Sequence, residues 1–166
     1  LGFCEVNKHS HHVNGETRFR EIQEYDIPRV KKMLQNHFNK FKLSLNINEE
    51  YVKHWIMPRK GTIYSYISKE EDKFLTFYSL DYVMKPNNKI IKQANAFYNV
   101  GNCLQDAIIL ARDLGFDMYN CSNISVDEEE LKKHGFVEGT GNNHYYLWNW
   151  KINQEIKPKD IGFVMI

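Results

Sequence analysis

Apolar residues recur every three or four positions between residues 26 and 41, with lysines and asparagines between them. This spacing predicts an amphipathic helix that packs one face on a core. Asp26 suits the cap of the first turn, because its carboxylate can accept from free backbone N–H groups, and Pro28 fits where a missing N–H costs little. A second, shorter helix is predicted to begin near Asn48 and to end before Pro58. The apolar positions of the two helices are Val30, Leu34, Phe38 and Phe41, and Val52, Trp55 and Ile56.

Two runs rich in aromatic and β-branched residues, 62–68 and 74–80, flank a charged stretch at residues 69–73. Such runs on either side of a polar turn predict a β-hairpin. Residues 82–89 contain a proline and two asparagines and are expected to form a loop. Residues 90–100 are expected to return as a further strand.

A helix, a strand and a second helix are predicted next along the chain. Residues 104–114 combine alanines with leucines and isoleucines and end at Gly115, which suits a left-handed cap. Residues 116–120 read as a strand, and the helix over 125–134 begins with acidic and ends with basic residues, which matches the helix dipole. A strand–helix–strand step indicates a parallel pair of strands. The expected fold class is α+β or mixed α/β, with a mixed, twisted central sheet flanked by helices.

The C-terminal part of the sequence contains two apolar runs. Gly139 and Gly141 permit a tight turn before the aromatic run of residues 144–150. This run predicts a strand, because large flat side chains pack well on a half-buried pleated surface. Residues 161–166 are also predicted to form a strand, with a free carboxylate on Ile166. Chain ends are usually polar, so an apolar C-terminal strand is unusual. Two interpretations stay open: an ordinary edge strand, or a strand whose terminal carboxylate has a chemical function.

Composition narrows the class of protein. A chain of 166 residues with 42% hydrophobic content can form one domain with its own core. A net charge of +1 gives no reason to expect binding to nucleic acid, and no apolar run is long enough to span a bilayer. The cysteines are odd in number and widely spaced, so a zinc ribbon or disulfide framework is not expected and a reduced, cytoplasmic setting fits best. They are Cys4, Cys103 and Cys121.

Residues 1–16 have little periodicity and are expected to be a flexible N-terminal segment or a remnant of cloning. A histidine cluster in this segment could hold a transition metal, since imidazole is a common metal ligand. No cysteine or carboxylate lies at the spacing of a zinc site, so a metal is not expected. The cluster consists of His9, His11 and His12. The absence of methionine at position 1 indicates a piece of a longer protein.

Five short motifs occur in the order and at about the spacing of one known family. They are Phe97-Tyr98-Asn99-Val100, Gly115-Phe116-Asp117, Gly139-Thr140-Gly141, Tyr145-Tyr146-Leu147-Trp148-Asn149-Trp150 and Gly162-Phe163-Val164-Met165-Ile166. On these motifs the sequence resembles the C-terminal half of eukaryotic N-myristoyltransferase (glycylpeptide N-tetradecanoyltransferase) over residues 17–166. The resemblance implies an acetyltransferase-like (GNAT-like) fold. It also implies that the complete enzyme transfers a tetradecanoyl group from myristoyl-CoA to the N-terminal glycine amine of proteins.

In that family the N-terminal half supplies the acyl-CoA site, so the resemblance makes this chain the peptide-binding half. Its expected partners are N-terminal glycine peptides and the N-terminal half, which holds most of the myristoyl-CoA. The sequence of the turn before the helix over 104–114 agrees with an acyl-CoA site in the N-terminal half. A CoA pyrophosphate is usually bound by free N–H groups of a glycine-rich turn at a helix start. The corresponding turn, residues 101–104, has a single glycine. This chain alone is therefore expected to bind no cofactor.

The resemblance places site residues by position. The family's C-terminal carboxylate, its general base, falls on Ile166. A peptide-groove asparagine falls on Asn120, and two further groove positions fall on Tyr82 and Asn95. At these two positions the family more often has a small hydroxyl residue and a tyrosine, so the lining differs here. For the groove residues, an ordinary role in a strand or turn stays open.

The family's Gly-Asp-Gly turn falls on Gly139, Thr140 and Gly141, and Thr140 departs from it. A neutral hydroxyl cannot attract a basic residue of the substrate by charge, so the preference for lysine is expected to be weaker. Two other functions stay open. One is a non-catalytic acetyltransferase-like module that binds peptides, and the other is an acetyltransferase with an atypical cofactor turn.

Overall fold

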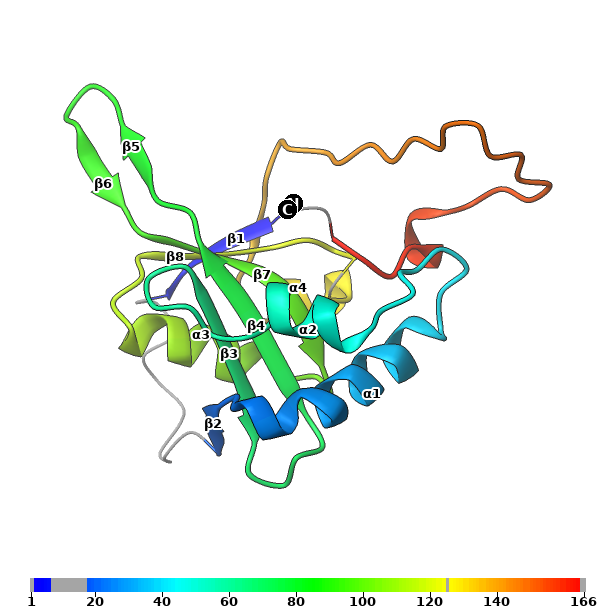
Figure 1. Ribbon diagram of the computed structural model, residues 1–166. Coiled ribbons are helices and arrows are strands. Elements are labelled where there is room, and N and C mark those ends of the chain that lie inside the picture. The colour runs from blue at the N-terminus through cyan, green and yellow to red at the C-terminus, as the bar shows by residue number, and fades with distance from the viewer. Residues whose placement is uncertain (1, 7–17, 125, 165–166) are drawn as a thin grey trace.

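The computed structural model describes residues 2–6, 18–124 and 126–164 (Figure 1). The helices and strands in chain order are β1 (Gly2–Glu5), β2 (Phe19–Glu21), η2 (Glu24–Asp26), α1 (Ile27–Phe38), α2 (Glu49–Trp55), β3 (Ile63–Ser68), β4 (Phe74–Ser79), β5 (Tyr82–Met84), β6 (Lys89–Ile91), β7 (Gln93–Val100), α3 (Leu104–Asp113), β8 (Met118–Cys121), α4 (Glu128–Lys133), β9 (Val137–Glu138) and η3 (Pro158–Asp160). Among the described residues, seven strands form one sheet in the order β2-β3-β4-β7-β8-β1-β9. β5 and β6 form a separate two-stranded hairpin that projects from the body.

The sheet is mixed, as predicted. β3 and β4 form the expected antiparallel hairpin, and β4 also pairs with β7. β7 and β8 are parallel and are connected through α3, which confirms the strand–helix–strand step. β1 lies between β8 and β9 and is antiparallel to both.

Each face of the sheet has its own apolar core. The first core holds α3 and α4 against residues such as Phe77 and Tyr119, whose rings lie 5.8 Å apart. The second core holds α1 and α2, with Phe38 against Tyr98 at 5.5 Å. The register between β4 and β7 shifts at Phe97, and this irregularity places both Phe97 and Tyr98 in the second core.

Several elements form where short-range features of the sequence predict them. α1 buries Val30, Leu34 and Phe38, as its spacing predicts. The side chain of Asn48 accepts from the backbone N–H of Tyr51 at 2.8 Å and so caps α2. Gly115 follows α3 with a φ of +80°, the left-handed conformation that its position requires.

The expectation of a flexible segment over residues 1–16 is wrong for β1. Its four residues pair with β8 along their whole length, and Cys4 is 3% exposed in the first core. A strand of four residues is too short for its alternation to be distinguished from chance. Residues 7–17, and with them His9, His11 and His12, lie outside the described residues.

Four predictions of strand and loop differ from the structure in the described residues. Residues 82–89, expected to be a loop, begin the β5–β6 hairpin, and the expected strand over 90–100 is divided between β6 and β7. The aromatic run 144–150 has no strand in the described chain. Of the expected strand over 161–166, the described part has a single parallel bridge between Ile161 and Leu43.

Asp26 lies at the start of α1 but its side chain does not cap that helix. Its carboxylate instead accepts from two nitrogens of Arg20, at 2.7 and 2.8 Å, and from the backbone N–H of Gln23 at 2.8 Å. The guanidinium of Arg20 lowers the pKa of Asp26 below its ordinary value, against the opposing effect of burial. A charged partner from β2 outcompetes the free N–H groups of the helix, because a bidentate Arg–carboxylate pair is the stronger bond.

Candidate functional site

One face of the sheet carries polar side chains where β7, β8 and β1 lie side by side. The register places residues of the three strands directly opposite one another, and alternate residues of a strand share a face. The side chains of this polar face are Gln93 and Asn95 of β7, Met118 and Asn120 of β8, and Phe3 and Glu5 of β1. The intervening residues, among them Cys4, Ala94 and Tyr119, are buried in the first core. Packing on one face of the sheet therefore sets which side chains form the polar face.

An amide cluster forms the centre of the polar face. Asn120 donates through Nδ2 to Oδ1 of Asn95 at 3.0 Å, and Gln93 donates through Nε2 to the same oxygen at 2.6 Å. Asn95 is 5% exposed, and its own Nδ2 is buried with no hydrogen-bond partner among the described residues. A buried donor without a partner costs about 1–3 kcal/mol. Asn95 therefore lies beneath the hollow as the shared acceptor of the cluster, and Gln93 and Asn120 are the amides that line the hollow itself.

Tyr82 brings the β5–β6 hairpin to the same place. Its hydroxyl donates to Sδ of Met118 at 3.5 Å. Tyr82 and residues of the polar face line a hollow of about 360 Å³, formed by Phe3, Glu5, Tyr82, Gln93, Met118 and Asn120. Three residues that the resemblance indicated, Tyr82, Asn95 and Asn120, are therefore brought together from separate elements.

β7 and β8 separate immediately beyond the amide cluster. Asn95 and Asn120 are the last residues that the two strands pair, yet β7 continues to Val100 beside β4. Ligands of sheets with parallel strands bind beyond the carboxyl ends of the strands, where the chain leads away in different directions. The polar face lies at such a point.

Glu5 and Phe3 also line the hollow, although no sequence pattern indicated them. Both come from β1, which was expected to lie in a flexible segment, and four residues of alternation carried no usable signal. Glu5 is exposed and gives the hollow a carboxylate. That charge favours ligands with a positive group.

The turn of Gly139, Thr140 and Gly141 does not line the hollow. It follows β9, which is separated from β8 by β1. Thr140 and Gly141 are exposed there, and Gly139 is half-buried. The structure thus places this turn at the sheet edge, two strands from Asn120.

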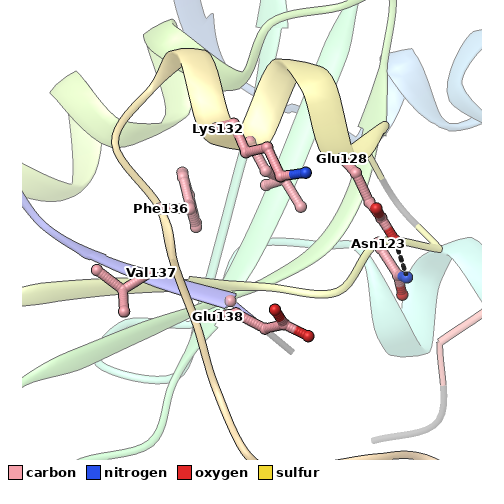
Figure 2. Close-up of a pocket in the computed structure, with 8 residues that line it drawn as sticks. Asn123, Glu128, Lys132, Phe136, Val137 and Glu138 are labelled. Carbon is pink, nitrogen blue, oxygen red and sulfur yellow. Dashed lines mark hydrogen bonds between the residues drawn. The ribbon is translucent and has the colours of Figure 1, made fainter.

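A second hollow, of about 200 Å³, lies between α4 and the edge of the sheet (Figure 2). Its lining residues are Gly2, Asn123, Glu128, Leu131, Lys132, Phe136, Val137 and Glu138. Asn123 donates through Nδ2 to Glu128 at 3.2 Å across one side of it. Of the site residues indicated by the sequence, none of those within the described ranges lines this second hollow.

The C-terminal segment is held to the loop between α1 and α2. Gly162 donates its N–H to the carbonyl of Leu43 at 2.9 Å, and Leu43 donates to the carbonyl of Asp160 at 2.9 Å. Tyr145 donates its hydroxyl to the carbonyl of Phe163 at 2.9 Å. The chain is therefore anchored up to Phe163, while Ile166 lies outside the described residues.

The cysteines do not supply a nucleophile. Burial raises the pKa of Cys4, Cys103 and Cys121 to about 12 in each case, so all three are neutral thiols at pH 7. Within the described ranges, no group of three or more His, Cys, Asp or Glu side chains is arranged to hold a metal ion. The same residues include no helix long and apolar enough to cross a membrane.

Comparison with protein families gives a match over almost the whole chain. The family described as "Myristoyl-CoA:protein N-myristoyltransferase, C-terminal domain" matches residues 5–164. Glycylpeptide N-tetradecanoyltransferase 1 of Arabidopsis thaliana is 30% identical over 161 residues, which are 89% of this chain and 37% of that protein. Glycylpeptide N-tetradecanoyltransferase 2 of Danio rerio is 33% identical over 158 residues, 88% of this chain and 32% of that protein. The chain thus spans about a third of the length of these relatives.

Solved structures agree on the fold. N-myristoyltransferase of Saccharomyces cerevisiae with bound myristoyl-CoA superimposes with a TM-score of 0.70 at 18% identity, over 92% of this chain and 47% of that one. A predicted acetyltransferase of Clostridium acetobutylicum with acetyl-CoA gives a TM-score of 0.59 at 13% identity, over 77% of this chain and 94% of that one. The expected acetyltransferase-like fold, a mixed sheet flanked by helices, is confirmed.

Proposed function

Because the chain belongs to the N-myristoyltransferase family, as its C-terminal domain, we propose that it is the peptide-binding part of an enzyme that myristoylates proteins. In the proposed reaction, the N-terminal glycine amine of a protein attacks the thioester carbonyl of myristoyl-CoA. An amide N–C bond forms, the C–S bond breaks, and CoA leaves as its thiol after taking up a proton.

The polar face is the observation that carries the peptide-binding role. An extended peptide presents alternating carbonyl and N–H groups, and amide side chains can both donate to and accept from them. Gln93 and Asn120 line the hollow and carry such amide groups, and both donate to Oδ1 of the buried Asn95, which holds them in position. The carboxylate of Glu5 attracts the positive charge of a peptide amine or lysine. Tyr82 closes the hollow from the β5–β6 hairpin.

Myristoyl-CoA belongs, in this proposal, mainly to the N-terminal domain of the longer protein. The turn between β7 and α3 supports this assignment of myristoyl-CoA, because the backbone at that turn is already in contact with other residues. Asn99 accepts the N–H of Cys103 at 3.0 Å, and a Cβ on Gly101 would come within 2.6 Å of Lys73. A pyrophosphate needs several free N–H groups at such a turn.

The general base in the proposal is the carboxylate of Ile166. The glycine amine has an ordinary pKa of about 7.7–8.0 and must lose a proton before it attacks. A carboxylate near apolar side chains is a stronger base than one in water, because burial disfavours its charged form and raises its pKa. The contacts of Gly162 and Phe163 hold the residues shortly before Ile166 against the body of the domain.

Substitution of Asn120 in the complete protein tests the peptide-binding role. Asn120→Ala is expected to raise the KM for a glycine peptide by about tenfold, the effect of losing roughly one hydrogen bond. Affinity for myristoyl-CoA, measured by calorimetry, is expected to stay unchanged. Asn123→Ala is the matched control, since Asn123 is exposed and lines the second hollow instead.

An unchanged peptide KM in a folded Asn120→Ala protein would contradict the placement of the peptide on the polar face. A complete protein that binds glycine peptides but transfers no myristoyl group would favour the alternative, a non-catalytic acetyltransferase-like module.

A further inference from the structure

The β5–β6 hairpin projects from the body of the domain beside the polar face (Figure 1). Its two strands have three residues each and, among the described residues, pair only with each other. Every residue from 81 to 90 is exposed. An isolated hairpin of two strands has little stability of its own in water, so these side chains are available to other molecules rather than needed for a core.

The register of the hairpin decides which side chains share a face. Tyr82 is paired with Ile91 at the base of the hairpin, and Met84 is paired with Lys89 two residues further out. Paired residues share a face and faces alternate along a strand, so both pairs lie on one side, the inner face. Ile91 is 6% exposed, and the hydroxyl of Tyr82 donates to Met118 of β8. The inner face is therefore turned toward the body of the domain.

The inner face continues the lining of the hollow outward. Tyr82 and Gln93, at the base of the hairpin, both line the hollow. At about 3.3 Å per residue, the pair of Met84 and Lys89 lies roughly 7 Å beyond Tyr82. Met84 is 40% exposed, and Lys89 is exposed as well. A peptide that leaves the hollow along the hairpin therefore passes an apolar side chain and an ammonium group.

The charges of the hairpin are all positive. Residues 82–93 include Lys85, Lys89 and Lys92 and no Asp or Glu. All three lysines are exposed, and none of them forms an ion pair with another described residue. Glu5, in contrast, gives the hollow a carboxylate. The two kinds of charge lie at different distances along the hairpin, and complementary charges on a partner fix its direction and register.

We propose that the inner face of the hairpin selects substrates with an acidic side chain downstream of the residues held in the hollow. The inference rests on the proposed function, because it requires a substrate peptide in the hollow. The carboxylate of that side chain pairs with Lys89, and its methylene groups contact Met84. An exposed pair of charges contributes little to affinity, so the hairpin sets a preference among substrates and is not required by all of them.

A scan of the charge along the peptide tests this selection. A single glutamate is moved one residue at a time along a peptide that begins with glycine, and glutamine at the same position is the neutral reference. The KM of the complete protein is expected to be about two- to fivefold lower for glutamate at the position that reaches Lys89. Salt at about 1 M should abolish the difference, because it shortens the Debye length to about 3 Å. Equal KM values at every position would overturn the proposal.

Charge reversal at position 89 identifies the residue responsible. Lys89→Glu is expected to make lysine the preferred residue at that peptide position, and Lys89→Arg to retain the preference for glutamate. Lys69→Glu is the matched control, because Lys69 is exposed in the turn between β3 and β4, at the end of β4 away from the hairpin. A preference that survives Lys89→Glu, or that Lys69→Glu reverses equally, would overturn the assignment to the hairpin.

The outcomes separate this proposal from the proposed function. A complete protein that transfers myristate without any preference for glutamate overturns the selection and leaves the function in place. Fluorescence anisotropy with the same labelled peptides gives a readout that needs no activity. A preference in affinity that depends on Lys89, in a protein that transfers no myristate, supports the selection and contradicts the transferase function.

Discussion

The backbone of Gly162 lies directly against the side chain of Phe41: a Cβ built on Gly162 would come within 2.6 Å of Cγ in the ring. Gly162 also donates to Leu43, two residues further along the same loop. The glycine allows the C-terminal segment to approach the loop after α1 more closely than a residue with a side chain could. This approach holds Gly162 against the loop after α1.

Substitution of this glycine is expected to disturb both stability and turnover. Gly162→Ala should lower the free energy of unfolding by about 1–3 kcal/mol, the usual cost of overpacking, and should reduce kcat of the complete protein. Urea unfolding and steady-state kinetics measure the two effects. Gly2→Ala is the control, because a Cβ there would have its nearest neighbour at 3.4 Å, an ordinary contact. Equal behaviour of the two variants would show that the close approach has no role.

Loss of the terminal carboxylate is expected to slow the proposed reaction. Extension of the chain beyond Ile166, or its deletion, should lower turnover of the complete protein by about 100-fold or more, the lower end of general-base effects. Myristoyl-CoA binding should be unchanged. Ile166→Val keeps a terminal carboxylate and should turn over normally. Circular dichroism checks folding, and a folded, extended protein with normal turnover would exclude the carboxylate as the base.

A charge at position 140 is expected to change substrate preference. Thr140 is exposed at the sheet edge, so Thr140→Asp should strengthen binding of peptides with a lysine after the N-terminal glycine by at most about 1 kcal/mol. KM values for lysine-containing and lysine-free peptides measure the effect in the complete protein. Thr140→Asn supplies the neutral control. Equal gains for both peptides would show that charge is not the cause.

Acid is expected to weaken the domain through Asp26. Because Arg20 lowers the pKa of Asp26 in the folded state, the stabilisation is complete above the unfolded pKa of about 3.9. It is lost as the pH falls through the lower folded pKa. Asp26→Asn should cost about 2 kcal/mol at pH 7, in the range of hydrogen bonds to charged groups, and should reduce the loss of stability between pH 5 and pH 2.

Urea unfolding at pH 7, 5, 3 and 2 measures this effect. Asp113→Asn is the control, because Asp113 is more than half exposed beside Arg112 and its loss should change little. The same acid sensitivity in Asp26→Asn and in the unsubstituted protein would contradict the assignment to Asp26.

Several elements were predictable because their signals are local. The spacing of Val30, Leu34 and Phe38 determines the buried face of α1, and Gly115 marks the end of α3 by a conformation that glycine adopts without strain. The β3–β4 hairpin follows from two strand-forming runs beside one short turn. In each case the interacting groups lie within a few residues of one another, so the local sequence is enough to predict the interaction.

The candidate site was predictable only in part. Tyr82, Asn95 and Asn120 were placed by resemblance to a family, and no spacing along the chain indicates that Tyr82 and Asn120 line one hollow or that Asn95 bonds to Asn120 beneath it. Glu5 and Phe3 join them because β1 inserts between β8 and β9. That insertion depends on backbone pairing with residues more than a hundred positions away, which leaves no signal within β1 itself.

The sequence by itself determined which segments can form helices and which segments have the composition of strands. Tertiary structure alone decided which strands find a partner. Residues 82–91 pair with each other and become a hairpin, whereas residues 144–150 have better strand composition and no strand in the described chain. A helix satisfies its backbone hydrogen bonds internally, but a strand needs a neighbour to satisfy its N–H and C=O groups. Composition can therefore favour a strand, but the rest of the fold must supply its partner.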